Sequence, residues 1–442
     1  MKRKKPGLSL GTILTLCLTA AVVAGCFFVF GKIRGKNAET YMDPQRMIGL
    51  VSVAIQGPTA ETEPMATVQT VTVTLAPVAA VPTASPAPQT ASATVPPATN
   101  NQRYSFSLTA AGLLSFQSEI SDAVYNKTEK SFDYRPIVSG LSSRVCADMN
   151  LVTLPQLINT ADRKYGDTLT VSEAADAVRA LGADQVILGT EHILDQGTQG
   201  AVDTVAALSS RGISCEGVTV GAAAQNRVIQ LNGGGVAILS YTDVLTAKGK
   251  NALRNNASIL QSFDLETARR DIQWARSQGA RCVIVCLYWG RADASSVTNA
   301  QRNTVKSLAE MGADIILGTR PGRVLPMEII SCVGEDGRAR EAFAAYSLGT
   351  LLTESREGFD ISGILLHLDV TCDTYGNVRV TRAEYTPTYI WRQAVNGKTQ
   401  YRVLCSADPA PAGMSDQQKQ VMQRALNRIQ TALQGSPVTQ RK

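Results

Sequence analysis

The sequence predicts an α/β sandwich in which mixed sheets are flanked by helices, preceded by one transmembrane helix and a disordered stalk. Three observations lead to this fold class. They are a long uncharged run near the N-terminus, a charge-free stretch rich in Ala, Thr and Pro, and repeated units in which a helix ends near a glycine and a buried strand follows. A chain of 442 residues has room for two or three domains.

The N-terminal run, residues 7–30, contains no charged residue and is rich in Leu, Val, Ala and Phe. As a helix it is long enough to cross a bilayer, so residues 7–31 are expected to be a membrane anchor and residues 1–6 a cytoplasmic tip. The MKRKK flank favours this orientation, although KIRGK on the other side is also basic. A cleaved signal peptide, or lipoprotein processing at Cys26, is the alternative. The apolar run continues past Cys26 and favours an uncleaved, single-pass anchor at the cell membrane, with the bulk of the chain extracytoplasmic.

The excess of basic residues belongs to the N-terminus. Residues 1–36 hold seven of the 43 Lys and Arg residues and no Asp or Glu. The 36 basic residues that remain face 37 acidic ones, so the rest of the chain is nearly neutral. This balance gives no indication of nucleic-acid binding.

Residues 32–103 are expected to form a linker. From residue 65 to residue 102 the chain has six prolines, no glycine and no charged residue. Such a composition cannot bury a core and favours a semi-extended stalk. We interpret it as a spacer that crosses a cell wall.

Residues 104–405 carry the pattern of a folded domain built from helix-to-strand units. In each unit an amphipathic helix leads into a buried strand. Four such units recur, at 170–189, 202–218, 264–290 and 299–318. The helix of the first unit is expected to begin at a Ser/Thr-type cap and to end at Gly182. Residues 406–442 are a C-terminal tail with an amphipathic helix, for which Ser415 is the expected N-cap.

Other segments add strands and turns to this plan. A strand at 104–112 and a buried strand at 149–155 are separated by a helical region around 132–148. Residues 363–387 alternate apolar and polar side chains around TYGN and predict an antiparallel hairpin. NGGGV, at 232–236, lacks the context of a phosphate-binding loop and is interpreted as a hairpin-type turn.

Several reactive residues are interpreted as structural. The nine cysteines fit no disulfide framework, because Cys17 and Cys26 lie in the anchor and an odd number remains. Cys282 and Cys286 lie on one face of an expected strand, about 13 Å apart, too far for a bridge within that strand. They are expected to be buried core residues. His367 lies within another expected strand and is also interpreted as structural.

Functional side chains of such sheets lie in loops just beyond the strand ends. These loops are 110–117, 153–158, 189–197, 288–293, 318–324 and 346–354. Only 189–197 combines a histidine with carboxylates, so Glu191, His192 and Asp195 are the candidate catalytic residues and His192 is the candidate metal ligand. The alternative is that His192 hydrogen-bonds its own loop, with Asp195 as partner, and that Asp195 is a turn or helix-cap residue.

The order of these loops and their sequence motifs resemble those of the bacterial capsule-synthesis family named for CapA, which is associated with poly-γ-glutamate capsules. The resemblance covers roughly residues 104–402. Its motifs are Gly112 in the first loop, the LD-G of TEHILDQG, YWG, GADIILGTRPGRV and YSLGT. It implies a calcineurin-like metallophosphoesterase fold and a CapA-like domain at residues 104–405.

Most positions that match the family's metal ligands have changed, whereas turn glycines and packing residues remain. Leu113 occupies a position at which the family's motif has an Asp, and Tyr288 one at which it has a His. Arg320 and Gly322 occupy the positions of two further His. The other replacements are Thr153, Leu154, Pro155, Thr190, Glu191 and Thr350. A guanidinium stays protonated and repels a divalent cation, and a phenol of reference pKa about 10 is a poor anionic ligand. The altered motifs therefore imply no metal cofactor and no metal-dependent catalysis.

Arg320, Arg323, Tyr288 and Trp289 are the residues expected to bind a ligand. The two arginines, with Arg291, would form an anion-binding rim for a polyglutamate, teichoic or phosphorylated polymer. The alternative is that these arginines are solvated or form ion pairs with acidic residues, namely Glu191, Asp293 or Glu354. For Trp289 the alternative is packing in the core.

These observations predict a membrane-anchored extracytoplasmic CapA-like protein involved in the synthesis, export or anchoring of a capsule or envelope polymer of poly-γ-glutamate type. Its expected partners are an anionic cell-surface polymer or capsule-synthesis membrane proteins. The first alternative is a metal-dependent hydrolase or phosphoesterase that uses a divalent metal such as Mn²⁺ at a non-standard site around Glu191, His192 and Asp195. The second is a structural envelope protein with no ligand.

Overall fold

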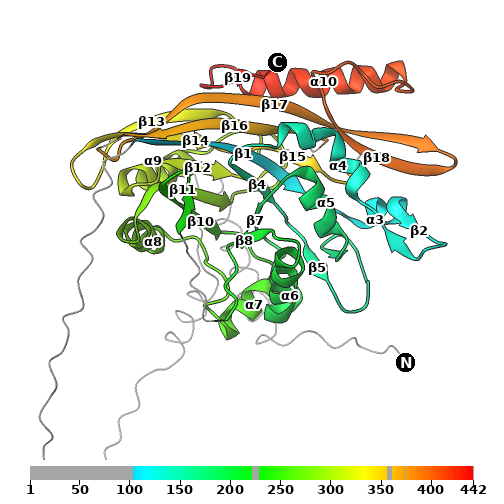
Figure 1. Cartoon of the computed structure of the whole chain (residues 1–442), viewed down its shortest axis with the longest axis horizontal. Helices are drawn as coiled ribbons and strands as arrows, with labels where there is room; N and C mark the ends of the chain where they lie inside the picture. The colour runs from blue at the N-terminus through cyan, green and yellow to red at the C-terminus, as the bar shows by residue number, and fades with distance from the viewer. Residues whose placement is uncertain (1–102, 222–227, 356–360, 374, 442) are drawn as a thin grey trace, which may run out of the picture. The chain divides into compact units, whose positions relative to one another are not determined.

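The computed structural model describes residues 103–221, 228–355, 361–373 and 375–441. The predicted cytoplasmic tip, anchor and all but the last residue of the linker lie outside these ranges. In the described part of the chain, no helix is both long and apolar enough to cross a membrane. These residues form a mixed α/β sandwich, as predicted: two sheets face each other and helices cover their outer faces (Figure 1).

Nine strands of the described chain form the larger sheet, in the order β18–β17–β16–β1–β4–β7–β8, with β15 beside β1 and β19 beside β17. β1, β4, β7 and β8 are parallel, whereas β16 pairs with β1 and β17 in antiparallel fashion, the latter as the predicted hairpin. The strands are β1 (Tyr104–Leu114), β4 (Met149–Thr153), β7 (Gln185–Ile187), β8 (Ser214–Glu216), β15 (Thr350–Leu352), β16 (Ser362–Cys372), β17 (Val378–Val395), β18 (Lys398–Cys405) and β19 (Thr439–Gln440).

The smaller sheet has six strands within the described ranges, in the order β13–β14–β12–β11–β10–β9. Its four inner strands are parallel, and β9 joins β10 through the hairpin predicted at NGGGV. The strands are β9 (Val228–Leu231), β10 (Gly234–Thr242), β11 (Ala280–Tyr288), β12 (Ile315–Gly318), β13 (Met327–Val333) and β14 (Ala339–Ala345). Two short ribbons pair β2 (Tyr125–Asn126) with β3 (Ser131–Phe132) and β5 (Leu157–Asn159) with β6 (Leu169–Val171).

One hydrophobic core lies between the two sheets. Phe106 and Leu151 of the larger sheet share it with Ile284 of the smaller sheet. Because side chains alternate along a strand, the opposite face of each sheet is left for helices to cover. Cys282 and Cys286 are buried free thiols in this core, which confirms the prediction for both.

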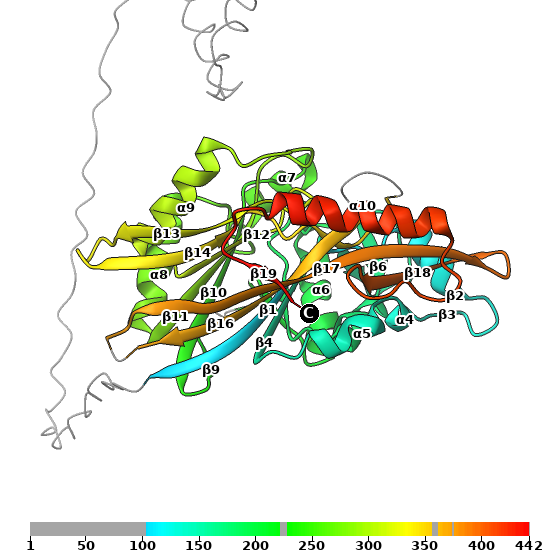
Figure 2. The same ribbon diagram turned by 90° about the horizontal axis from the view of Figure 1, so that it is seen from above.

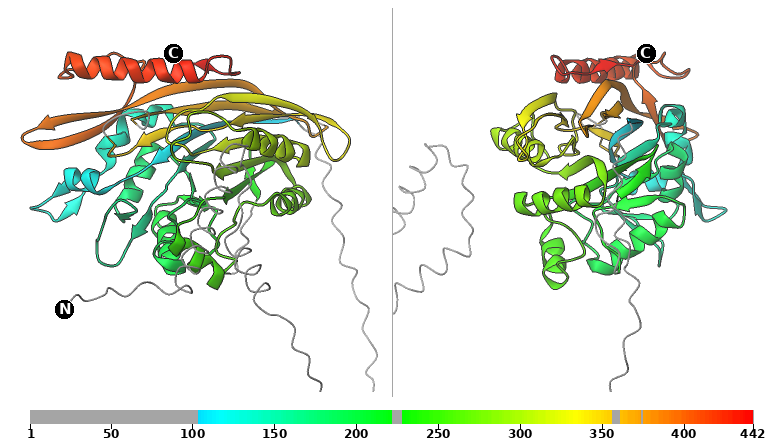
Figure 3. Two further views of the ribbon diagram at one scale, coloured as in Figure 1. Left: turned by 180° about the vertical axis from the view of Figure 1, so that it is seen from behind. Right: turned by 60° about the vertical axis from the view of Figure 1, so that its left-hand side comes forward.

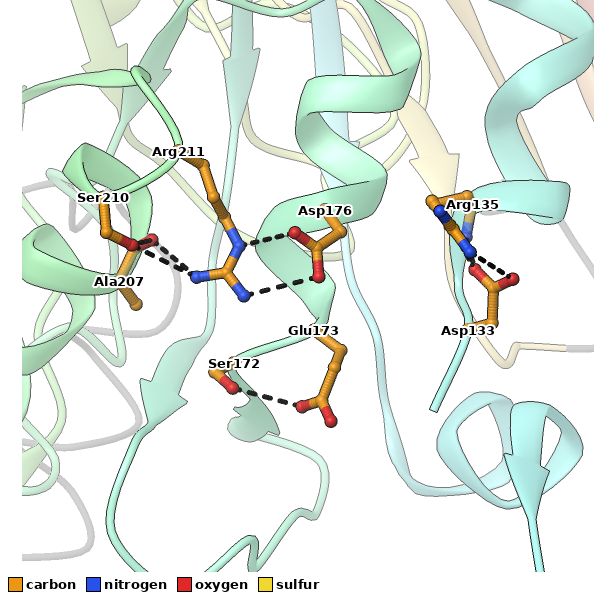
Figure 4. Close-up of polar contacts among 8 residues, drawn as sticks. All are labelled: Asp133, Arg135, Ser172, Glu173, Asp176, Ala207, Ser210 and Arg211. Atoms are coloured by element: carbon orange, nitrogen blue, oxygen red, sulfur yellow. Dashed lines mark hydrogen bonds and ion pairs between the residues drawn. The ribbon is translucent and has the colours of Figure 1, made fainter. Parts of the chain in front are cut away.

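Five short helices cover the outer face of the larger sheet: α3 (Ser118–Val124), α4 (Arg135–Val138), the 3-10 helix η1 (Ser139–Arg144), α5 (Ala174–Leu181) and α6 (Gly197–Ser209). Arg211, just after α6, ties that helix to α5 (Figure 4). Its Nε donates to Oδ1 of Asp176 at 2.7 Å, and its Nη1 donates to the carbonyl of Ala207 at 3.1 Å.

Two helices, α8 (Leu265–Ser277) and α9 (Asn299–Met311), cover the outer face of the smaller sheet. Each begins at a side-chain cap: Asp264 accepts from the backbone of α8, and Thr298 forms a capping box with Gln301. A further helix, α7 (Ala247–Asn255), follows β10 and is capped by Thr246. The caps of α8 and α9 explain why these two helices begin where the sequence predicts.

The C-terminal helix α10 (Asp416–Ala432) lies on the same side of the larger sheet as the smaller sheet does. On β17, Tyr389 and Trp391 pack against α10, whereas Ile390 between them belongs to the core under the outer helices. Figures 2 and 3 show α10 lying lengthwise over β17, beside the smaller sheet. The helix therefore extends the layer that the smaller sheet forms.

The predicted helix ends are confirmed with one exception. Gly182 ends α5 in the left-handed region, at φ +100°, and Ser415 caps α10. The predicted Ser/Thr-type start of α5 is wrong. The N-cap is Glu173, which makes no side-chain capping bond, and the hydroxyl of Ser172 donates to the Glu173 carboxylate instead (Figure 4).

Candidate functional site

Loops at the carboxyl ends of parallel strands from both sheets meet at one side of the sandwich. They follow β1 and β7 in the larger sheet and β10, β11 and β12 in the smaller one. Three hydrogen bonds join them: Leu113 N to Gly349 O (3.0 Å), Thr350 Oγ1 to Gly322 O (2.9 Å) and Thr246 N to Glu191 O (3.4 Å). The structure thus brings most of the predicted loops together.

The first loop is held by a close approach between two glycines. A Cβ atom on Gly112 would lie 2.0 Å from the carbonyl oxygen of Gly349. β15 pairs with the end of β1 at this point, with Leu113 opposite Thr350. Leu113, which stands where the family resemblance expects an Asp, offers no ligand atom to the site.

His192 and Asp195 form a pair within their own loop. His192 Nδ1 lies 2.8 Å from Asp195 Oδ2, as the alternative interpretation of this histidine predicted. The other oxygen of Asp195 accepts from the Thr246 hydroxyl. That hydroxyl also accepts from the backbone at the start of α7, so the pair fastens the 189–197 loop to the N-terminus of α7.

Arg320 turns inward and occupies the centre of the loop cluster. Its Nη2 lies 3.2 Å from Oε2 of Glu191, and its Nη1 donates to the carbonyl of Gly290 at 2.9 Å. Its guanidinium carbon lies 5.5 Å from the centroid of the Tyr288 ring. The Arg320 side chain is 13% exposed and that of Glu191 is 25% exposed, so the ion pair is largely shielded from water.

Tyr288 and Trp289 are both buried. Burial raises the pKa of Tyr288 to about 12, although the charge of Arg320 opposes the shift, so the phenol is protonated at neutral pH. Trp289 stacks on Tyr346 with ring centroids 6.1 Å apart, and its Nε1 donates to the carbonyl of Tyr346. Trp289 is only 4% exposed, as the packing alternative predicts, and its contact with a ligand stays a prediction.

The three arginines expected to form one rim have different neighbours. Arg320 is held by Glu191, and Arg291 forms an exposed ion pair with Asp293 at 2.7 Å. Arg323 instead lines a groove beside α10. The ion-pair alternative therefore describes Arg320 and Arg291, and the anion-binding rim stays a prediction.

The residues at this site do not fit a divalent metal. Hard cations require several anionic or neutral oxygen and nitrogen ligands, whereas the centre here holds the Arg320 guanidinium. Glu191 is committed to Arg320, and His192 is committed to Asp195. Across the described residues, no group of three or more His, Cys, Asp and Glu side chains is placed to hold a metal ion.

Asp243 is a site residue that the sequence interpretation missed. It follows β10 directly, and one of its carboxylate oxygens lies 3.5 Å from the backbone nitrogen of Gly290. Burial raises the pKa of this carboxyl, while the Gly290 hydrogen bond and the charge of Arg320 oppose the shift. An acidic residue directly after the buried strand VAILSYT was the available signal.

The family model described as "Bacterial capsule synthesis protein PGA_cap" matches residues 107–355, more than half of the chain. The chain therefore belongs to this family of bacterial capsule synthesis proteins. The match includes every loop of the site described above.

Curated relatives carry capsule names. The "PGA biosynthesis protein CapA" of Bacillus subtilis (strain 168) is 23% identical over 290 residues, which span 64% of this chain and 71% of that protein. The "Capsule biosynthesis protein CapA" of Bacillus anthracis is 27% identical over 154 residues, 34% of this chain and 37% of that protein. Among solved structures, NAD nucleotidase (NadN) of Haemophilus influenzae matches with a TM-score of 0.39 and 12% identity, over 77% of this chain and 57% of that one.

Proposed function

We propose that this protein serves the synthesis, export or anchoring of a capsule or cell-envelope polymer without metal-dependent catalysis. The observation that carries the proposal is the ion pair between Arg320 and Glu191 at the centre of the loop cluster. A fixed cation there opposes the binding of a second, divalent cation. The family membership and the capsule names of the relatives support the polymer role.

The scaffold we propose is a calcineurin-like metallophosphoesterase-type sandwich whose ligand positions have been replaced. Two facing sheets with helices outside, and loops gathered at the carboxyl ends of parallel strands, support this scaffold. In place of metal ions, side-chain contacts connect the loops. Arg320 links three of them, and Asp195 links the 189–197 loop to α7 through Thr246.

A hydrolysis assay tests the absence of metal-dependent catalysis. The full-length chain, with and without added Mn²⁺, is incubated with a chromogenic phosphodiester. We expect a rate equal to that of buffer with the same Mn²⁺ concentration. Mn²⁺-dependent hydrolysis by the protein that disappears in a His192→Ala variant would establish the hydrolase alternative around Glu191, His192 and Asp195.

The membrane anchor and the extracytoplasmic position are part of the same proposal. The uncharged run at residues 7–31 supports the anchor. We expect the full-length chain to remain in the membrane pellet after a carbonate wash and a variant lacking residues 7–31 to be found in the supernatant. External protease should digest the full-length chain in cells stripped of their wall. Recovery of the full-length chain in the soluble fraction would contradict the anchor.

The proposed partners are an anionic cell-surface polymer or the membrane proteins that make it. The chain's own cationic side chains near the loop cluster support a polymer ligand, since arginine pairs well with carboxylates and phosphates. Retention of the protein on immobilised poly-γ-glutamate, and its absence from a neutral dextran matrix, is the expected result.

A further inference from the structure

The strand β13 forms one edge of the smaller sheet, next to α9, and β14 is its only neighbour in the described sheet (Figure 2). In the described part of the chain three large apolar side chains are exposed, and two of them lie on this strand. Ile329 is 42% exposed and Val333 is 63% exposed. An edge strand that shows apolar side chains to solvent is a place where a further strand adds to a sheet.

The backbone of β13 faces β14 and the open edge in turn. In β14 the backbone nitrogen of Phe343 donates to the carbonyl of Asp314, just before β12, so the odd-numbered residues of β14 face β12 and the even-numbered ones face β13. The register of the two strands pairs even-numbered residues with even-numbered residues. On β13, therefore, Ile329, Ser331 and Val333 direct their N–H and C=O groups away from the sheet.

Both ends of this outward edge are closed. At one end the backbone nitrogen of Met327 donates to the hydroxyl of Ser436 at 2.9 Å, so the C-terminal tail covers the edge there. At the other end the chain turns back at Gly334, whose nitrogen donates to the carbonyl of Arg338 at 2.8 Å. Between these ends, no hydrogen bond joins the outward N–H and C=O groups to another residue of the described ranges.

The open edge is complementary to a second copy of itself. When two β13 strands run antiparallel with the two Ser331 residues opposite each other, Ile329 of each copy lies opposite Val333 of the other. All the outward N–H and C=O groups of both strands are then paired. Residues 329–334 include no charged side chain, so this register brings no like charges face to face.

The neighbouring registers fit less well. A shift by two residues in one direction places Met327, whose nitrogen is already held by Ser436, opposite Val333 of the second copy. A shift in the other direction places the carboxylate of Glu335 opposite Ile329. The register centred on Ser331 avoids both conflicts.

We propose that two copies of this chain pair through β13, antiparallel and in the register centred on Ser331. The two smaller sheets then form one continuous sheet across a two-fold axis. Ile329 and Val333 of both copies pack together at this joint, while Ile330 and Cys332, on the other face of the strand, stay packed against the core beneath α8 and α9. An interface built on one short strand from each copy belongs to the class of weak, reversible associations.

Two charge variants of the full-length chain test the pairing by sedimentation equilibrium in a density-matched detergent. Ile329→Lys with Val333→Lys places like charges opposite each other in the proposed register, whereas Ile329→Lys with Val333→Glu places opposite charges there. Both variants lose the same two apolar side chains, so each controls for the other. We expect a reversible wild-type dimer, with a dissociation constant about tenfold higher in the like-charge variant than in the opposite-charge variant. Circular dichroism and thermal unfolding verify that both variants fold.

A disulfide tests the register. The Cα atoms of a hydrogen-bonded antiparallel pair lie about 5.5 Å apart, within the range that a disulfide spans. With diamide as the oxidant, Ser331→Cys is expected to form a covalent dimer several-fold faster than Ser142→Cys, a control at an exposed position on η1. The wild type, treated in the same way, gives the background from the native cysteines.

Every contrary outcome is distinct from failure of the polymer role, because none of these measurements involves a polymer. A wild type that stays monomeric at all concentrations would overturn the proposal. A dimer that the two charge variants weaken equally, or that neither weakens, would also overturn it, because association would then occur through another surface or register. Cross-linking of Ser331→Cys no faster than that of Ser142→Cys would contradict the two-fold pairing at Ser331.

Discussion

Arg320 is the residue that gives the loop cluster its chemistry. Its guanidinium contacts Glu191, the carbonyl of Gly290 and the ring of Tyr288, so it fills the space between three loops with a permanent positive charge. The sequence alone predicted that Arg320 would exclude a metal, because that inference needs only the charge of the side chain. The identity of its partner depended on the fold, and Glu191 was only one of three acidic residues considered.

Breaking this ion pair from either side should destabilise the protein. Arg320→Met leaves the Glu191 carboxylate poorly paired beside a buried phenol, and we expect the free energy of unfolding to fall by about 2 kcal/mol. Glu191→Gln should act in the same direction. The double variant should lose less than the sum of the two, as measured by urea denaturation in a double-mutant cycle. Additive losses would show that the two side chains do not interact.

His367 should make the stability of the domain depend on pH. Its ring lies between the hydroxyls of Thr109 (3.2 Å) and Thr386 (3.0 Å). Burial lowers the pKa of His367 to about 4, and nearby arginines add to the shift. Because the folded-state pKa is below the unfolded value of about 6.5, this group costs stability as the pH falls from about 6.5 to about 4.

The size of this effect follows from the same pKa shift. Between pH 7 and pH 5 the wild type should lose about 2 kcal/mol more than a His367→Gln variant, whose amide does not titrate. Urea unfolding of both proteins at the two pH values measures the difference. Parallel pH dependence in wild type and variant would contradict the assignment.

At the scale of elements, the ends of strands and helices explain where the sequence was informative. Gly182 and Gly312 end α5 and α9 in the left-handed region, and both stops are visible in the sequence as glycines after an amphipathic run. The start of α5 was not predictable, because Glu173 makes no capping bond and the helix is stabilised by burial of its apolar face. Asp243 was not predicted, because a single acidic residue after the buried strand β10 carries no motif that separates a site residue from an ordinary loop residue.

The contact between β1 and the YSLG segment is the most sterically restricted part of the site. We expect Gly112→Ala to lower the free energy of unfolding by about 3 kcal/mol, because its Cβ would lie 2.0 Å from a backbone oxygen that cannot move independently. Gly140→Ala is the matched control: its Cβ would lie 3.7 Å from Val403 O, an ordinary contact, and its stability should stay within about 1 kcal/mol of the wild type. Equal stabilities for the two variants would show that β1 and the segment can separate freely.

At the scale of the whole molecule, the sequence predicted the two-sheet plan and the loops that meet, but not the neighbours that α10 acquires. The repeated helix-to-strand units determine the sheets, because each buried strand needs helices or another sheet on both faces. α10 is positioned by its packing against Tyr389 and Trp391 of β17. No sequence pattern within residues 406–442 reveals this contact. For that reason the sequence groups Arg323 only with Arg320, whereas in the structure Arg323 also lines a groove with Arg424 and Arg428.

The central claim is that the loop cluster of this capsule-family protein holds an arginine–glutamate pair where a metal site would need anionic ligands. Elemental analysis of the full-length chain, purified without chelators and dialysed after exposure to Mn²⁺ and Zn²⁺, tests it most directly. The account predicts divalent metal well below one equivalent per chain, with no difference between the wild type and His192→Ala. One or more equivalents of metal in the wild type, lost in His192→Ala, would contradict it.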